Sequence, residues 1–418
     1  MRQMLTSSEV TGPEPLGGQI ACGVSGVFSE TRGAFASPID MDPAISKKSL
    51  HARIVRLLSA TGNPHGRQVI LALAFVLPLA ACTQRTSTPT QNSADAHSVS
   101  EEAVHFASGK ITLAGTLVLP GGTQQHPAVV LFHGSGPQER DLFMARWFAE
   151  QGITALTYDK RGVGESTGDF RAVPFMELCD DGLAAIEYLK LRKDIDAKHI
   201  GVWGLSQGGW LGPLAASRSA DVAFVIAVSG PGVSPGEQMI VYYANELRAE
   251  GVAESDVREA SAVRRDIWNY MSNGNGYERV KKELEQAHTK GWFSKAKVQQ
   301  DDSFGTLPMP AELSKQPAHS TQWFKQEAVY DPVPALRALK VPALFLFGDK
   351  DQLIPVEESV AVIRRVLAED GHHDFTIREF PNDDHGMRLT TGESYGEIDP
   401  EYLKTMRAWL ATHVRNSH

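Results

Sequence analysis

The spacing of hydrophobic and polar residues changes along this chain. Short apolar runs such as 128–132 are typical of strands buried on both faces, and the helical spacing of 175–191 is typical of a helix with one buried face. This alternation predicts strands at 102–106, 111–119, 128–132, 153–158, 200–205, 222–228, 343–347 and 375–380, with helices at 140–151, 175–191, 208–218, 356–369 and 399–414. Strands that alternate with helices predict an α/β fold with a mainly parallel, doubly wound sheet.

Residues 236–330 interrupt this alternation. They contain no run that predicts a buried strand, whereas the spacing of apolar residues predicts helices at 242–251, 254–271 and 277–288. The segment is too long to be a loop of a compact domain, so we expect an inserted helical cap at about 236–330. It holds 11 of the 33 aromatic residues, and we expect most of them to pack within the cap and a few to line a substrate cavity.

The first 100 residues show neither the alternation of strands and helices nor the helical spacing of the cap. Residues 1–65 have no sustained period, which predicts a disordered upstream segment, and residues 83–100 are almost wholly polar, which predicts a linker. The apolar run at 69–81 is too short to cross a bilayer as a helix and has the length of a signal-peptide core. The alternative is a buried helix followed by an ordinary cysteine.

The end of that run, Leu79-Ala80-Ala81-Cys82, resembles the lipobox of bacterial lipoproteins. The resemblance implies that Cys82 carries a diacylglycerol and becomes the mature N-terminus, so that a lipid anchor holds the protein to a membrane of the bacterial cell envelope, on the periplasmic side or at the outer membrane. A signal peptide normally begins near the N-terminus. We therefore hypothesise that translation starts downstream of Met1, for example at Val55.

Charge and cysteine content exclude other classes of protein. The 418 residues have a formal net charge of -9, and residues 1–82, with seven Lys or Arg and five Asp or Glu, leave -11 for the remainder. An acidic chain of this kind is not expected to bind nucleic acid. Its three cysteines are too few for a disulfide framework and too scattered for a zinc site, and we expect Cys179 to be an inert buried thiol.

The sequence Gly204-Leu205-Ser206-Gln207-Gly208 stands between a predicted strand and a predicted helix. This G-x-S-x-G context is that of a nucleophile elbow, a sharp turn that exposes a serine hydroxyl and leaves no room for side chains two residues on either side. We predict Ser206 as the nucleophile. The alternative is a serine that only caps the following helix.

A serine nucleophile needs a base, and the base needs an orienting acid. His385 follows the strand 375–380 at the carboxyl edge of the sheet, which makes it the candidate base. His372 and His373 precede the same strand, so we expect them at the surface of the opposite edge; a metal site with Asp374 is the less favoured alternative. The acid is expected after the strand 343–347, where Asp349 and Asp351 compete; Asp383 and Asp384 are less favoured because they adjoin the histidine.

Two backbone amides are needed to stabilise the oxyanion. One is expected from Gln207, directly after the nucleophile, and the other from the loop 133–137, where we favour the amide of Ser135. His133 is expected to fasten this loop rather than to catalyse. The segment 159–166 fails the G-x-G-x-x-G pattern because position 167 is Thr, so we interpret it as a rim loop held by Asp159 and Arg161.

Together these motifs resemble the α/β-hydrolase superfamily over roughly residues 101–415, in its bacterial carboxylesterase and serine-peptidase-like branch. Members carry the acid at the second Asp of a G-x-x-D-x-x-[VI]-P pattern, here Gly348 to Pro355, which implies Asp351 as the acid and leaves Asp349 to brace the turn. The resemblance implies one hydrolase domain at 101–418 that cleaves a small-molecule acyl ester through an acyl-enzyme, without metal or cofactor. A serine aminopeptidase or acyltransferase is the alternative within this fold, and a catalytically idle lipoprotein that binds an apolar ligand is the alternative outside enzymes.

Overall fold

The computed structural model describes residues 98–296, 308–316 and 323–415. The expected upstream segment, the signal sequence with Cys82 and most of the linker 83–100 lie outside the described residues. The strands are β1 Ser100–Ser108, β2 Ile111–Leu119, β3 His126–Phe132, β4 Thr154–Tyr158, β5 Ile195–Leu205, β6 Val225–Val228, β7 Ala343–Gly348 and β8 Phe375–Phe380. The longer helices are α2 Leu142–Glu150, α3 Phe175–Lys190, α4 Gln207–Arg218, α5 Pro235–Ala249, α6 Glu254–Asn273, α7 Tyr277–Ala287, α11 Val356–Glu369 and α12 Pro400–Leu410.

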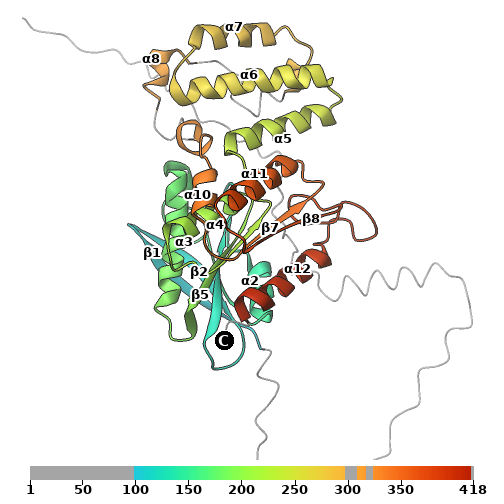
Figure 1. The fold of residues 1–418 in the computed structure, drawn as a ribbon. Helices are drawn as coiled ribbons and strands as arrows, with labels where there is room; N and C mark the ends of the chain where they lie inside the picture. Colours follow the sequence, from blue (N-terminus) through green and yellow to red (C-terminus); the bar gives the residue numbers. More distant parts are fainter. Residues whose placement is uncertain (1–97, 297–307, 317–322, 416–418) are drawn as a thin grey trace, which may run out of the picture. The chain divides into compact units, whose positions relative to one another are not determined.

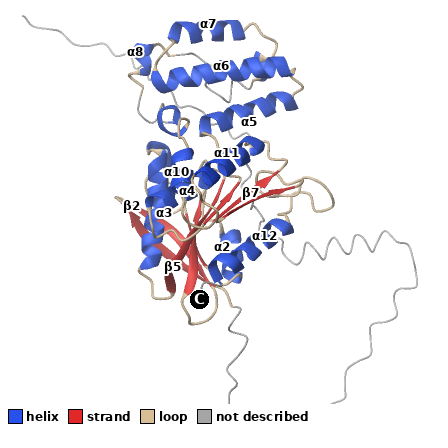
Figure 2. Ribbon diagram, viewed as in Figure 1, coloured by secondary structure: helices blue, strands red, loops and turns tan. Residues whose placement is uncertain are grey.

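The eight strands form one sheet in the order β1-β2-β4-β3-β5-β6-β7-β8. The first two pairings, β1 with β2 and β2 with β4, are antiparallel, and every other pairing is parallel. Figure 2 shows helices on both faces of this sheet. The predicted mainly parallel, doubly wound sheet is therefore confirmed.

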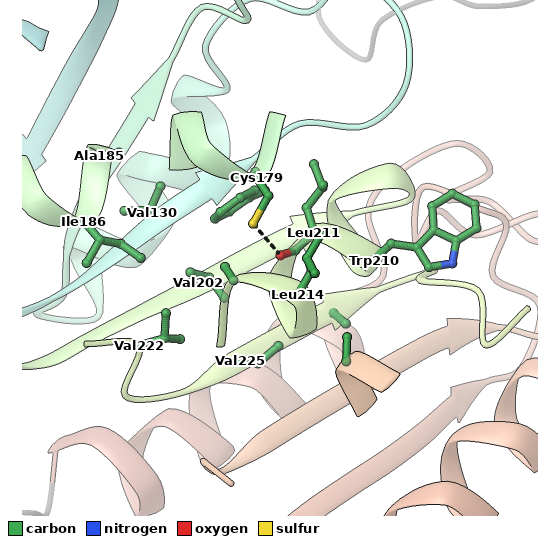
Figure 3. Packing of buried hydrophobic residues seen from close by; sticks show 14 of the residues in the cluster. Val130, Cys179, Ala185, Ile186, Val202, Trp210, Leu211, Leu214, Val222 and Val225 are labelled. Atoms are coloured by element: carbon green, nitrogen blue, oxygen red, sulfur yellow. Dashed lines mark hydrogen bonds between the residues drawn. The ribbon is translucent and has the colours of Figure 1, made fainter. Parts of the chain in front are cut away.

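The alternation of side chains along each strand explains the two layers of helices. On β3, Val130 packs into a cluster with α3, α4 and α11, whereas its neighbours Val129 and Leu131 pack into a second cluster with α2 and α12. Because both faces are covered, every residue of β3 is buried, as its continuous apolar run requires. Figure 3 shows part of the first cluster, where Cys179 of α3 lies against Leu211 of α4. Cys179 is fully buried, as predicted.

The segment between β6 and β7 builds the cap with a core of its own. Helices α5, α6 and α7 lie side by side (Figure 1), and their apolar faces form a third cluster that includes Trp268 and Trp292. Shorter pieces follow: η3 Phe293–Lys295, α8 Pro310–Leu313 and the π-helical η5 Trp323–Glu327. No strand occurs among the described residues of this segment. The inserted helical cap is confirmed as part of the fold.

Three element boundaries differ from the predictions. The first cap helix begins at Pro235 and not at residue 242, because Ser234 accepts a hydrogen bond from the amide of Glu237 and proline occupies the first helical position. Strand β5 begins at Ile195, five residues early, because Ile195 pairs with His126 before an irregularity in the ladder. Strand β6 is shorter than predicted and begins at Val225.

The cap is also fastened to the loop that follows β7. On α5, the side-chain amide of Gln238 donates to the carbonyl of Leu353, and that of Asn245 donates to the carbonyl of Gln352 at 2.9 Å. Helix α10 Val333–Ala338, which leads back into the sheet, packs against α4 and α11. The insertion therefore leaves the order of the strands intact and contacts the core at the carboxyl ends of the strands.

Candidate active site

Ser206 lies at the sharp turn between β5 and α4. Its φ of 57° and ψ of -112° are strained for a residue with a side chain, and its amide donates to the carbonyl of Val228 at 2.9 Å. A Cβ on Gly204 would meet the carbonyl oxygen of Gly208 at 2.2 Å, and one on Gly208 would meet the carbonyl oxygen of Phe132 at 2.7 Å. These contacts are the physical reason for glycine two residues on either side of Ser206.

The same turn places Ser206 at the N-terminus of α4. The amides of the first helical turn have no partner within the helix, and the helix dipole favours negative charge there. Gln207, the first residue of α4, is one of these, so its amide is available to an anion beside Ser206. The Cα atoms of Gly209 and Gly230 approach so closely that a Cβ on Gly209 would lie 2.3 Å from that of Gly230, which holds α4 down on the sheet.

Asp351 and His385 meet at the carboxyl ends of β7 and β8. His385 Nδ1 lies 2.7 Å from Asp351 Oδ2, and Asp351 Oδ1 accepts the amides of Leu353 at 2.8 Å and Ile354 at 3.2 Å. The Asp351 side chain is fully buried, while His385 keeps 18% of its side chain exposed. A carboxylate held by two amides can orient an imidazole ring through Nδ1, which is the arrangement that a histidine base requires.

The other candidate acids have different contacts. Asp349 Oδ1 accepts the amide of Asn382 at 2.7 Å, so it braces one loop against the next. Asp384 Oδ1 accepts the amides of Gly386 and Arg388 and shapes the turn that carries His385. Asp383 is fully buried, and its pKa is raised to about 7 by burial and by the neighbouring charge of Asp399. In this arrangement Asp351 is the carboxylate that contacts His385.

Ser229 joins the two parts of the site and was missed by the sequence analysis. It follows β6 with a φ of 48°, and its hydroxyl donates to the carbonyl of His385 at 2.9 Å. Its amide donates to Leu346 of β7, while the preceding residue Val228 accepts the amide of Ser206. The turn after β6 therefore contacts both the serine turn and the histidine loop. Only its proximity to the end of a strand could have drawn attention to it.

The loop 133–137 borders the serine turn. A Cβ on Gly208 would lie 3.0 Å from the carbonyl oxygen of His133, and the Gly134 amide donates to Gln138 Oε1 at 2.9 Å. His133 Nε2 lies 2.5 Å from the carbonyl of Tyr158, which fits the expected fastening role. Burial and the charge of Lys160 lower the His133 pKa to about 3, so the ring is neutral and donates this bond. Ser135 lies exposed in the same loop.

The segment 159–166 packs against this loop. Asp159 is held by Arg140 and accepts the amide of Glu165, and Arg161 forms a buried ion pair with Asp181 at 2.7 Å. Asp159 and Arg161 therefore hold the rim loop as predicted. Between them, Lys160 is buried and was missed by the sequence analysis, which gave this position no role.

A cavity of about 250 Å³ opens in the cap, between α5, α6 and the segment 323–331. Trp268 and Phe324 form aromatic walls, and Glu237 and Arg265 pair at its edge at 2.7 Å. Some of the cap aromatics therefore do line a cavity. Its wall includes Ala328, whose carbonyl accepts the amide of Gly236 and so ties the segment 323–331 to α5.

The histidines before β8 only partly follow the prediction. His373 is exposed, but His372 is buried, stacks on Phe375 and has its pKa lowered by burial, so its expected surface position was wrong. No cluster of three or more His, Cys, Asp or Glu side chains with metal-binding geometry occurs among the described residues.

None of the helices in the described ranges combines the length and the apolar character needed to cross a bilayer.

The chain is similar to several known proteins. An uncharacterized 31.7 kDa protein of Escherichia coli, from the traX-finO intergenic region, is 25% identical over 259 residues, which cover 61% of this chain and 83% of that protein. Esterase EstD of Thermotoga maritima is 26% identical over 315 residues, 71% of this chain and 65% of the esterase. The crystal structure of the alpha/beta hydrolase GrgF from Penicillium sp. sh18 aligns with a TM-score of 0.47 and 20% identity over 76% of this chain and 99% of that one.

A family model matches residues 123–387, from β3 to the loop that carries His385, which is more than half of the chain. Together with the order of the strands, this match confirms the expected α/β-hydrolase fold. The chain belongs to the Hydrolase_4 family, described as serine aminopeptidase, S33, and is thus a member of a serine hydrolase family.

Proposed function

We propose that this protein hydrolyses carboxylic esters through an acyl-enzyme formed on Ser206. The observation that carries the proposal is the contact of 2.7 Å between Asp351 Oδ2 and His385 Nδ1. The turn after β6 contacts both the loop that carries His385, through Ser229, and the turn that contains Ser206. A strained serine at a helix N-terminus, with an oriented imidazole at the same edge of the sheet, supports nucleophilic catalysis. The similarity to an esterase supports the substrate class.

In the proposed mechanism Ser206 Oγ attacks the acyl carbonyl carbon while His385 Nε2 takes the hydroxyl proton. Asp351 holds the ring by its Nδ1–H and stabilises the imidazolium. The amides of Gln207 and Ser135 stabilise the oxyanion, and His385 returns the proton to the leaving alcohol. Water then attacks the acyl-enzyme by the same route and releases the acid. No metal or cofactor takes part in these steps.

The test is the hydrolysis of p-nitrophenyl esters of graded chain length by wild type and by Ser206→Ala. Loss of a triad residue typically lowers kcat by about 10⁴–10⁶-fold, so turnover should fall to the background rate. A fluorophosphonate should label wild type at Ser206, as identified by peptide mass spectrometry. Ser217→Ala is the matched control, because Ser217 lies on the same helix and bonds only the carbonyl of Leu214. Ester turnover that survives in Ser206→Ala would refute the mechanism.

A serine aminopeptidase is the second candidate, and the description of the matching family favours it. The same triad would then attack an amide, with His385 returning the proton to the leaving amine. An aminoacyl p-nitroanilide assayed beside the esters separates the two. If kcat/KM for the anilide exceeds that for every ester, the substrate class is a peptide and not an ester.

The sequence before β1 supports a second proposal, on where in the cell the protein is located. The lipobox-like sequence at Cys82 supports a lipid anchor in the bacterial cell envelope. Globomycin, which blocks the lipoprotein signal peptidase, should then cause a larger precursor to accumulate, and Cys82→Ala should prevent labelling by a palmitate analogue. Unchanged migration and labelling would exclude the anchor.

A further inference from the structure

Lys160 is a buried ammonium that the proposed reaction does not use. Only 2% of the residue is exposed, yet three acceptors surround its Nζ. It donates to the carbonyl of Gly134 at 2.7 Å, to the carbonyl of Gly136 at 3.1 Å and to Gln207 Oε1 at 2.8 Å. An ammonium has three protons, so all three are matched by an acceptor.

The first of these contacts sets the direction of a backbone amide. A peptide group is planar and trans, so its carbonyl and the N–H of the following residue point in opposite directions. When Lys160 holds the carbonyl of Gly134, it fixes the plane of that peptide and turns the Ser135 N–H away from the ammonium. The contact with Gly136 fixes the other end of the same turn.

The third contact reaches the side chain of Gln207, the residue whose backbone amide is the other expected oxyanion donor. Gln207 follows Ser206, and its side chain is held at both ends: Oε1 accepts from Lys160, and Nε2 donates to Glu327 Oε1 at 2.7 Å. Glu327 is the last residue of η5 in the cap. It lies between Phe324 and Ala328, which both line the cap cavity. The chain of contacts therefore runs from the loop 133–137 to the wall of that cavity.

We propose that Lys160 is a positioning residue: it fixes the peptide that carries the Ser135 amide and ties this peptide to the side chain of Gln207, and Glu327 extends these contacts to the cap. The proposal rests on the proposed function of the site. It assigns to the cap a part in turnover, because displacing Glu327 releases the side chain of Gln207. Lys160 touches no reacting atom in this scheme.

The charged groups around Lys160 predict how its three hydrogen bonds depend on pH. Burial lowers the pKa of Lys160 to about 8, although the negative charges of Glu327 and Asp181 raise it in part. His133 is neutral, and the ring of Phe170 lies 5.3 Å from Nζ. A deprotonated amine has two protons for three acceptors, so one contact is lost. We therefore expect kcat to fall as pH rises through about 8.

The main experiment compares the pH profile of kcat in wild type and Lys160→Met, from pH 6 to 10 with a p-nitrophenyl ester. Misplacing a donor by about 1 Å can cost about 10²-fold. We expect kcat to fall by about that factor, KM to change by less than about threefold, and the decline near pH 8 to disappear. Labelling of Ser206 by a fluorophosphonate should remain complete. Lys198→Met, an exposed lysine near the start of β5, is the matched control and should match wild type.

A second variant keeps the proposal falsifiable if Lys160→Met does not fold. Glu327→Gln removes the charge that raises the pKa of Lys160, so the decline of kcat should move to lower pH, with a loss of about threefold to tenfold at pH 7 from the weakened contact with Gln207. Glu278→Gln, on the exposed face of α7, is its control. Its profile should coincide with that of wild type.

These outcomes separate the inference from the proposed function. If Ser206→Ala is inactive but Lys160→Met keeps the wild-type kcat, or keeps the decline near pH 8, the inference is wrong and the serine mechanism stands. A wild-type kcat that is constant from pH 7 to 10, or a Glu327→Gln profile that does not move, overturns the inference as well. Activity retained in Ser206→Ala contradicts the proposed function itself.

Discussion

The serine part and the histidine part of the site are built by different means. Around Ser206 the chain is held by backbone against backbone: Gly204, Gly208 and Gly209 stand where any Cβ would meet another backbone atom closer than 3 Å. Around His385 the chain is held by side chains that accept amides across loops, as Asp351 and Asp384 do. The first construction leaves no space for a substitution, whereas the second can lose one hydrogen bond and keep its fold.

From this contrast we expect substitutions in the two parts to have different effects. Changes beside Ser206 are expected to act on folding, because atoms cannot overlap and the chain must move. Changes beside His385 are expected to act on activity or on the pH dependence of stability and to leave the fold intact, because each side chain contributes one contact among several.

The largest effect is expected from Gly204→Ala. The added Cβ would lie 2.2 Å from the carbonyl oxygen of Gly208, which is backbone and cannot move aside, so α4 must leave its place on β5. We expect insoluble protein or a fall of more than about 4 kcal/mol in the free energy of unfolding, measured by urea denaturation. Gly212→Ala on α4 is the control: its Cβ would meet only side-chain methyl groups at 3.4 and 3.5 Å. If both variants are equally stable, the steric account of the serine turn is wrong.

Asp351→Asn should come next and should spare the fold. An amide in place of the carboxylate no longer stabilises the imidazolium and favours the wrong tautomer, a change that can lower kcat by about 10⁴-fold. The matched control is Asp349→Asn, two residues earlier in the same loop, which contacts Asn382 and not His385 and should lose less than about tenfold. Steady-state kinetics with a p-nitrophenyl ester decide between them. The reverse ranking would make Asp349 the orienting acid.

Asp383→Asn should change how stability depends on pH. The folded carboxyl has a pKa of about 7 against an ordinary 3.8, so the unfolded chain releases this proton first and wild-type stability falls as pH rises from about 4 to 7. In the variant the neutral amide does not ionise, so this fall in stability does not occur. Relative to wild type, the variant should gain up to about 4 kcal/mol between pH 4 and pH 8, since one pKa unit corresponds to about 1.4 kcal/mol. Thermal unfolding at both pH values measures this, and parallel curves would contradict it.

The smallest effect is expected from Ser229→Ala. Alanine accepts the positive φ at a cost similar to that of serine, so the substitution isolates the hydrogen bond to the carbonyl of His385. A neutral hydrogen bond contributes about 0.5–1.5 kcal/mol, so kcat should fall by a few-fold with little change in Tm. An unchanged kcat would show that the histidine loop keeps its place without this contact with the turn after β6.

The contrast also explains what could be predicted from the sequence. Glycines required by close backbone contact leave a short, local pattern, and so the turn at Ser206 could be located from five neighbouring residues. The order of strands and helices followed from the alternation of apolar runs. Asp351 could be chosen over Asp349 because a resemblance supplied the spacing, although either aspartate lies at the end of the strand.

Other residues could not have been found in this way because their partners are distant in sequence. Gln207 and Glu327 are 120 residues apart, and Ser229 and His385 are 156 residues apart. Lys160 stands between two charged neighbours, so the local pattern predicts a solvated lysine, and only the packing of three loops buries it. The position of His372 was predicted wrongly because a polar residue before a strand gives no indication that its ring will be buried against Phe375.

The way the cap is attached has a consequence for protein engineering. The cap is a single insertion between β6 and β7, which are neighbours in the sheet. A helical segment from a relative could therefore be grafted there without disturbing the sheet. A graft chosen only for its cavity would nevertheless discard the partners of Leu353 and Gln207. Transplanting Gln238, Asn245 and Glu327 with the new segment would keep the three side-chain hydrogen bonds described above between the cap and the catalytic domain.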